Sequence, residues 1–512
     1  MADLNEWLSV DYPNGGGSTI VNLTIQPNYD GDRTQRLKIQ GLKKTVFVDV
    51  EQSVANTEEI DREYFYIHFE EPNGIFYIQT YNTDWGNELD IDYSFDGVNW
   101  INKKVVKRQQ FALGDNKRIY LRNNTKSLSY NNVRYILYLI DRAKVGGNIL
   151  SLSDMKTGAF ARLFYNNTKL TDASNLILPD YVEMNCYLDL FWGCTNLQYP
   201  PQLPATTLAY GCYSYMFHNC TNLQYTPELP ATELAENCYG EMFYGCSSLI
   251  NAPQLPVTEL AVDCYNGMFA SCTSLINAPQ LPATTLVDGC YFQMFANCTS
   301  LVTAPELPAT TLANSCYSYM FRDCTSLINA PELPATTLTK LCYSGMFMDC
   351  TSLVNAPQLP ATTLTDYCYE IMFSGCTSLI NAPELPATTL AEYCYRDMFN
   401  GCTSLINAPE LPAMTLRYYC YESMFEGCTS LVNAPELPAI EIGGSCYNYM
   451  FKDCINLQYI KILTEKQDLV QYECFGWTQN VSPTGTFVKK KGVTFLTGVS
   501  GIPDGWEVIE ID

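Results

Sequence analysis

The sequence predicts a mixed fold, in which β-sandwich-like domains precede a long solenoid of stacked repeats. A 26-residue unit recurs eleven times from Cys186 onward without insertion or deletion, and each unit carries a second cysteine eight residues after the first. Such strict periodicity is typical of coils that stack on copies of themselves. Residues 1–150 instead alternate apolar and polar side chains in short runs between glycine-containing turns, which predicts strands.

These patterns divide the 512 residues into five segments. Because the open ends of a stack of coils must be shielded, divergent units are expected on both sides of the regular ones. The segments are a partial β domain at 1–52, a β-sandwich-like domain at 53–150, an N-terminal cap repeat at 151–185, the solenoid of eleven 26-residue units at 186–462, and a C-terminal cap at 463–512.

The first segment shows short alternating runs, at 19–25, 36–39 and 45–50, that predict antiparallel strands. Trp7–Val10, the glycine turn after it, Gly31–Arg33 and Val46–Gln52 resemble the second half of a BACON domain, an Ig-like sandwich module of Bacteroidetes proteins and their phages. The strands that precede the tryptophan in that family are absent. The resemblance therefore implies an exposed sheet edge, and we expect a partner chain to complete it by strand addition.

The second segment predicts strands at 64–69, 74–78, 89–93 and 118–121, with a hairpin around Asp96-Gly97. Trp85 and Trp100 are candidate sugar platforms, as in carbohydrate-binding sandwiches, and alternatively core residues. The core interpretation is favoured here.

Both caps retain traces of the unit. Leu163-Phe164 stands where the unit has Met-Phe, and Asn167 replaces the second cysteine. At the other end, Cys474–Trp477 resembles one more coil, and short strands over 486–509 are expected to cover it.

The regular unit, Met-Phe-x-x-Cys-Thr-Ser-Leu followed by Leu-x-x-Ala-Pro-x-Leu, resembles the BspA-type leucine-rich repeats of bacterial and phage surface proteins. The resemblance implies a leucine-rich-repeat solenoid with one short parallel strand per coil, about 4.8 Å apart, giving a sheet roughly 50 Å long. Pro279 and its equivalents fall inside that strand, which predicts a bulge. A turn of helix or 3₁₀-helix between the cysteines would place Cys290, Met294 and Cys298 on a common inward side.

The 23 cysteines follow the repeat period, which predicts buried columns of reduced thiols. Disulfides in part of the set remain the alternative. The eight-residue spacing and the two histidines of the chain argue against zinc, and we expect no cofactor or metal.

Charge and hydropathy exclude several classes of partner. Between Cys186 and Ile460 there are 23 acidic and five basic residues. Such a surface repels nucleic acid and anionic membranes, so neither is expected as a partner. No apolar run is long enough to span a bilayer, and the N-terminal residues do not resemble a signal peptide.

Seven positions per unit hold nearly all of its sequence variation: three before the first cysteine, two after Cys-Tyr and two after Met-Phe. Two interpretations stay open. The positions form either a solvated face whose sequence varies without a binding role, or a recognition surface. Exposed tyrosines give rigid contact area for sugars or proteins. The candidate ligand-binding residues are Tyr210, Tyr367, Tyr393, Tyr418 and Tyr419.

The opposing face carries an asparagine column at Asn277 and its equivalents, expected to form hydrogen bonds along the solenoid. A Glu/Gln column beside it, which includes Glu306 and Glu332, has cation binding as a weak alternative.

No catalytic motif is present, and the two histidines, His68 and His218, lie in different domains, so an enzyme is not expected. The resemblances imply a phage virion protein (head fibre, tail fibre or decoration protein), assembled in the host cytoplasm and located in the virion. It would attach to other virion proteins through residues 1–52, form a homo-oligomer, and present its solenoid to a host surface glycan or protein. A cell-surface adhesin of BspA type is the alternative.

Overall fold

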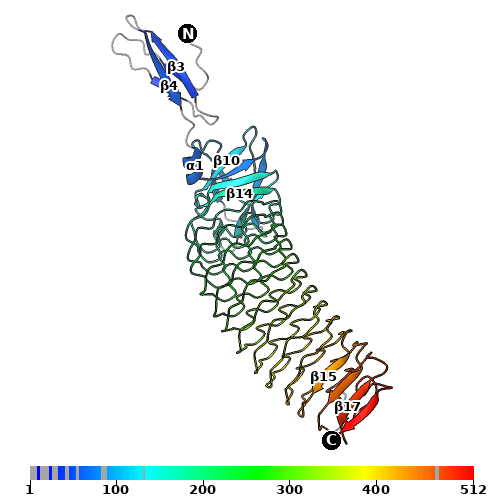
Figure 1. The fold of residues 1–512 in the computed structure, drawn as a ribbon. Helices are drawn as coiled ribbons and strands as arrows, with labels where there is room; N and C mark the ends of the chain where they lie inside the picture. Colours follow the sequence, from blue (N-terminus) through cyan, green and yellow to red (C-terminus); the bar gives the residue numbers. More distant parts are fainter. Residues whose placement is uncertain are drawn as a thin grey trace.

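The computed structural model describes residues 8–11, 22–25, 33–40, 45–52, 57–81, 89–130, 133–466 and 472–512. It shows a β-rich N-terminal part followed by a curved stack of coils (Figure 1). Among the described residues, no helix combines the length and the apolar character that crossing a membrane requires.

Two antiparallel pairs occupy the first segment. β1 (Leu8–Asp11) pairs with β2 (Asn22–Ile25), and β3 (Arg33–Gln40) pairs with β4 (Thr45–Gln52). Strands thus occur where the alternating runs predict them. Much of the stretch that resembles a BACON domain, including Trp7 and the glycine turn, lies outside the described residues, so the expected strand addition stays a prediction.

The described residues of 57–148, together with β14 (Leu170–Ile177) of the cap repeat, form one short helix and two sheets. The first sheet has the order β14-β13-β5-β10-β7-β8 and the second the order β11-β12-β6-β9. Aromatic contacts join the two sheets, since Tyr93 packs edge-on against Phe111 at 5.7 Å and Phe69 lies 6.4 Å from Phe76. The elements are α1 (Thr57–Glu63), β5 (Phe65–Phe69), β6 (Ile75–Tyr81), β7 (Leu89–Ser94), β8 (Ile101–Val105), β9 (Arg108–Ala112), β10 (Arg118–Asn123), β11 (Ser129–Tyr130), β12 (Val133–Leu139), β13 (Ala143–Asn148) and the 3₁₀ turn η1 (Ile149–Ser151).

The cap repeat joins these sheets to the solenoid. β14 (Leu170–Ile177) pairs parallel with β13 and so extends the first sheet. Asn167, fully buried where the regular unit has a cysteine, accepts a hydrogen bond from the Leu139 amide at 2.7 Å and donates one to the Leu137 carbonyl. An amide can satisfy both a donor and an acceptor of β12, which a thiol does less well. The apolar core consequently runs without a break from the sheets into the coils.

The segment between the two cysteines of each coil is neither an α-helix nor a 3₁₀-helix, and the expectation of a helical turn is wrong. Its amides alternate between two kinds of hydrogen bond. The Met216 amide bonds to the carbonyl three residues back, whereas the Phe217 amide bonds to Met242 in the next coil at 2.9 Å. A helix would use every amide within its own segment, and here half of them join coil to coil instead.

This alternation depends on left-handed backbone at three positions of each coil: immediately before the first cysteine, three residues after it, and immediately before the second cysteine. Asn, Asp and Gly, which adopt this conformation at least cost, occupy many of these sites. All three are variable positions of the unit, so part of the variation reflects a backbone requirement.

Among these residues, Ile371 has the largest conformational strain, because it is β-branched and has a φ of 49°. Gly267 and Gly345 occupy the same position in other coils. We expect Ile371→Gly to raise the free energy of unfolding by about 1 kcal/mol by removing this strain. Urea unfolding of the full chain measures it. Ile380→Gly, at an exposed position without positive φ, is the matched control, and a gain in stability there would contradict the explanation.

The interior consists of residue columns that run the length of the solenoid. Cys290, Met294 and Cys298 are fully buried, as are their equivalents in the regular coils, which confirms the inward columns. Tyrosines that follow the first cysteine stack at 5.6–6.3 Å from Tyr187 to Tyr447. A second stack of phenylalanines runs in parallel, and Trp477 of the C-terminal cap covers both, 6.0 Å from Tyr447 and 6.2 Å from Phe451.

The strand face differs from expectation. Most coils are linked there only by isolated parallel bridges, such as Asn251 to Asn277, and not by a continuous 50 Å sheet. Strands form at the C-terminal end, where β15 (Asn433–Leu437), β16 (Tyr459–Ile462), β17 (Thr486–Lys490) and β18 (Glu507–Ile511) pair in parallel. Register shifts between Asn433 and Glu436, across Pro435, as predicted for the proline bulge. Proline removes the amide a ladder needs, which explains the short pairing in the other coils.

Candidate recognition surface

Three of the five candidate tyrosines lie together on the variable flank. Tyr367, Tyr393 and Tyr419 stand immediately before the first cysteine of consecutive coils, and their rings stack at 4.6 and 4.7 Å with interplanar angles of 5° and 6°. We call these three residues the tyrosine ladder. The three side chains are half-buried, and stacking covers both faces of Tyr393 and the inner faces of Tyr367 and Tyr419.

The other two candidates occupy the neighbouring position, two residues before the first cysteine. Tyr418 is 56% exposed beside the ladder, and its ring lies over Gly444 of the next coil, where a Cβ would approach it to 3.1 Å. Tyr210 is also exposed, but it lies eight coils away, which is roughly 40 Å at the spacing of parallel strands. The structure therefore brings four of the five candidates together and separates Tyr210 from them.

Cations border the tyrosine ladder. The Lys340 ammonium lies 5.6 Å from the Tyr367 ring, and the Arg396 guanidinium lies 4.9 Å from the Tyr393 ring. Arg396 also forms an ion pair with Glu370, and burial raises the pKa of that carboxyl against the opposing effect of the arginine. All five basic residues between Cys186 and Ile460 occupy variable positions, so the flank carries mixed charge.

The ladder residues hold strained backbone. Tyr367, Tyr393 and Tyr419 have φ values of 57–59°, whereas the equivalent positions of earlier coils include Asn185 and Gly211. A bulky side chain in this conformation costs on the order of 1 kcal/mol. The fold does not need tyrosine here, since the equivalent positions of other coils carry Asn, Asp, Gly, Ser or Leu, and Leu341 has the same left-handed backbone with a φ of 60°.

A second aromatic group was not among the candidates. Trp192, His218 and Tyr244, at the position after Met-Phe in the first three coils, stack at 3.7 and 4.5 Å. His218 is nearly buried between its neighbours, and its Nε2 lies 3.4 Å from Glu241. Comparing the same position in successive coils reveals this group, whereas inspecting each unit separately does not. His218 therefore belongs to the packing, whereas Trp192 and Tyr244 are half-buried on either side of it.

Aromatic residues of the N-terminal sheets are also engaged. Trp100 packs against Tyr64 with ring centres 4.6 Å apart, and the Arg122 guanidinium lies over its ring at 4.2 Å. This agrees with a structural role. Trp85 lies outside the described residues.

The cysteine columns hold buried thiols. The Sγ of Cys220 donates to the Phe191 carbonyl at 3.2 Å, and the same bond recurs at the second cysteine of every unit. Burial raises the pKa of the Cys290 and Cys402 thiols to about 12. Within the described residues no group of three or more His, Cys, Asp or Glu side chains is arranged to hold a metal ion.

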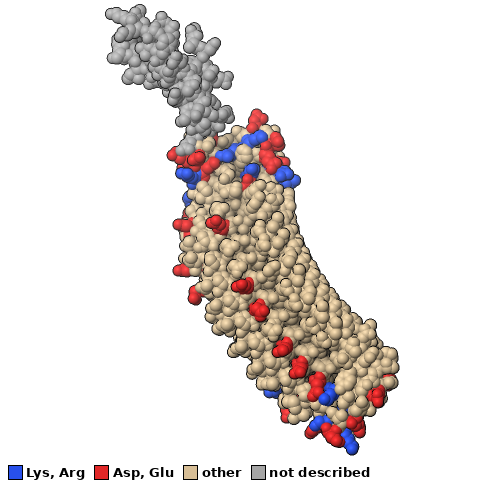
Figure 2. Space-filling model, in the orientation of Figure 1, with Lys and Arg blue, Asp and Glu red and all other residues tan. Residues whose placement is uncertain are grey.

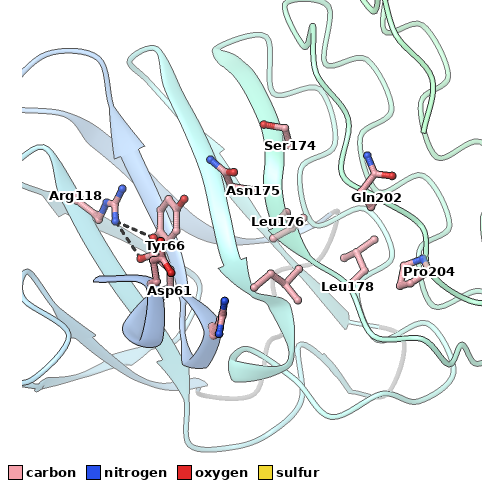
Figure 3. Close-up of a pocket in the computed structure, with 12 residues that line it drawn as sticks. Asp61, Tyr66, Arg118, Ser174, Asn175, Leu176, Leu178, Gln202 and Pro204 are labelled. Atoms are coloured by element: carbon pink, nitrogen blue, oxygen red, sulfur yellow. Dashed lines mark hydrogen bonds and ion pairs between the residues drawn. The ribbon is translucent and has the colours of Figure 1, made fainter. Parts of the chain in front are cut away.

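A cleft of about 700 Å³ lies where the N-terminal sheets meet the first coils (Figure 3). The Asp61–Arg118 ion pair, with Nη1 3.0 Å from Oδ1, lines one side, and Tyr120 donates to the same carboxylate oxygen. Asn175 and Gln202 line the opposite side. Glu58 and Arg62 also line the cleft, so its lining is charged as well as polar, and no occupant is assigned to it.

The repeats match a known family. The model described as BspA type leucine rich repeat region (6 copies) matches residues 187–328, 266–405 and 358–482, which together exceed half of the chain. The chain belongs to this family. Its BspA-type repeats are the coils whose cysteines, Met-Phe pairs and leucines fill the interior.

Other comparisons add little. No curated protein matches the chain. A solved structure described as the crystal structure of a TLR13–ssRNA13 complex matches at 13% identity, with a TM-score of 0.23, over 68% of this chain and 47% of that one. The match thus spans about half of that chain, and a TM-score this low supports no inference about fold or ligand.

Proposed function

We propose that this protein is a non-catalytic adhesion or structural component that recognises a host protein or glycan along the flank of its C-terminal coils. The observation that carries the proposal is the tyrosine ladder, in which three consecutive coils stack tyrosines at a left-handed position where other coils carry Asn, Asp, Gly, Ser or Leu. Each stacked ring pair stabilises the folded chain by roughly 0.5–1.5 kcal/mol, so packing of the rings offsets part of the backbone strain. The half-buried rings of the ladder, with the exposed side chains of Tyr418 and Lys340, then form one contact surface.

The geometry of the tyrosine ladder favours a partner that contacts the edges of the tyrosine rings. Stacked faces are unavailable, whereas Tyr418 keeps a largely exposed ring for a sugar or an apolar side chain. Tyrosine suits such contacts because it offers a large area at low cost in side-chain entropy. Both glycans and proteins therefore belong in the first screen.

Removing the tyrosine ladder tests this function. The triple variant Tyr367→Asn, Tyr393→Asn, Tyr419→Asn uses the residue present at Asn185 and Asn237, so the fold is expected to persist with stability unchanged or raised. We expect binding to host cells and to any glycan on an array to fall at least tenfold. Tyr225→Asn, which removes an exposed tyrosine from the strand face, is the control and should bind normally. If the triple variant binds as well as the wild-type chain, the proposal is refuted. If the wild-type chain binds neither cells nor any glycan, recognition is refuted and only the structural role is left.

The more specific role implied by the sequence resemblances is a phage virion fibre or decoration protein attached through residues 1–52. Its support is the repeat family together with the resemblance to a BACON domain. Mass spectrometry of purified virions should detect the chain. Detection on intact bacterial cells instead would favour the cell-surface adhesin. Native mass measurements with and without residues 1–52 test assembly, and a monomer in both would exclude oligomerisation through that segment.

A further inference from the structure

The strand face carries two rows of exposed side chains that the fold does not require. The first, the aliphatic row, occupies the fourth position after the second cysteine, and each of its members is 36–52% exposed. Gln198, Gln224 and Gln458 hold the same position in other coils, so a polar residue fits there. The aliphatic row consists of Ile250, Ile276, Val302, Ile328, Val354, Ile380, Ile406 and Val432.

The second, the glutamate row, occupies the eighth position after the second cysteine. Gln202, Gln254, Gln280 and Gln358 hold this position in four coils, so the fold accepts the uncharged residue of the same shape. Six coils nevertheless carry glutamate, although like charges on neighbouring coils repel. Only Glu436 has an ion-pair partner among the described residues, Lys461 at 2.7 Å. The glutamate row consists of Glu228, Glu306, Glu332, Glu384, Glu410 and Glu436.

The surface between the rows is uncharged and hollowed. Asparagine side chains line it and bond from coil to coil, as Asn277 does to Asn251 at 3.0 Å, which confirms the expected asparagine column. Two adjoining hollows of about 520 and 450 Å³ have alanines and prolines in their walls and Glu384, Glu410 and Glu436 at their margin. Figure 2 shows acidic side chains in a file along the solenoid, with uncharged surface beside them.

We propose that this face binds an amphipathic basic helix of a protein partner, which lies along the solenoid between the two rows. Four extended residues separate the rows, a distance of about 13 Å, and a helix with its side chains is about 10–12 Å wide. Successive coils are about 4.8 Å apart and successive helix turns 5.4 Å, so each turn meets about one coil. The helix would place an apolar stripe on the aliphatic row and Lys or Arg on the glutamate row.

Charge complementarity indicates that the partner carries a net positive charge. None of the five basic residues between Cys186 and Ile460 lies on the strand face, because all occupy the variable flank. Aliphatic groups exposed in a row eight coils long form a continuous apolar patch of the kind that marks interaction sites. An acidic or purely polar partner would gain nothing from either row.

Fluorescence anisotropy with the full chain tests the proposal. The probe is a labelled 21-residue peptide of Leu and Lys with heptad spacing, which forms an amphipathic helix. Two further probes are the same peptide with Glu in place of Lys, and the Leu/Lys peptide interrupted by proline, which prevents a continuous helix. We expect the first probe to bind at least tenfold more tightly than either of the others, with affinity that falls as salt is raised. Equal binding of the proline-interrupted peptide would overturn the helix, and no binding of the first probe would overturn the site.

Matched variants locate the binding. The face variant changes Glu306, Glu332, Glu384 and Glu410 to Gln, the residue native to other coils. The flank control removes the same charge through Glu236→Gln, Asp288→Asn, Asp366→Asn and Glu392→Gln, at exposed positions. We expect at least tenfold weaker binding by the face variant and less than a twofold change for the control. Equal losses would show attraction to overall charge alone. Ile328→Gln with Ile380→Gln should also weaken binding at least threefold, and an unchanged affinity would exclude the aliphatic row.

Discussion

Phe321→Ala is expected to lower the free energy of unfolding by about 3–5 kcal/mol. Phe321 is fully buried in the middle of the phenylalanine stack, with neighbouring rings at 5.7 Å on both sides. Its removal leaves a cavity that rigid neighbouring coils close only in part, and it interrupts the column at its centre. Urea unfolding followed by circular dichroism measures the change.

Phe292→Ala provides the control within the same chain. Phe292 occupies a variable position, is partly exposed, and among the described residues its ring contacts one other aromatic ring, that of Tyr319, edge-on at 6.2 Å. We expect a loss below about 1 kcal/mol, since little apolar area leaves the interior. Equal losses at both sites would contradict the separation between interior columns and variable flank.

Raising the pH above about 9 is expected to unfold the solenoid, the second large effect. Burial raises the pKa of thiols such as Cys290 and Cys342 from 9.0 to about 12. Below pH 9 the thiols are protonated in both the folded and the unfolded chain, so the stability they contribute is fully present. Above pH 9 they ionise only in the unfolded chain, and stability falls until the pH passes about 12.

The size of this effect follows from the number of thiols. Each thiol that ionises only in the unfolded chain removes about 1.4 kcal/mol of stability per pH unit. Because burial raises the pKa of 22 cysteines in this way or similarly, a total stability of typically 5–15 kcal/mol is exhausted within about one to two pH units. Circular dichroism from pH 7 to 12 locates the transition. Stability that stays constant up to pH 11 would contradict buried, protonated thiols.

The sequence alone was sufficient for the solenoid and its interior. A unit repeated without slippage must place equivalent residues in equivalent positions, so Cys290, Met294 and Cys298 could be assigned to inward columns from one coil. Asn167 and Trp477 could be singled out because they break the pattern of the unit, and the structure shows Asn167 bonded to β12 and Trp477 packed over both aromatic stacks. Pro435 shifts the strand register for a reason visible in the sequence, its missing amide.

Three-dimensional structure decided what depends on contacts between coils. The segment between the cysteines is not helical because its alternate amides bond to the next coil, a pairing that one unit does not reveal. The same stacking turns Tyr367, Tyr393 and Tyr419 into a ladder and leaves Tyr210 apart, since side chains meet only when they hold the same position in adjacent coils. The sequence thus determined which residues repeat, and the spacing and backbone conformation of the stacked coils determined which of them form a surface.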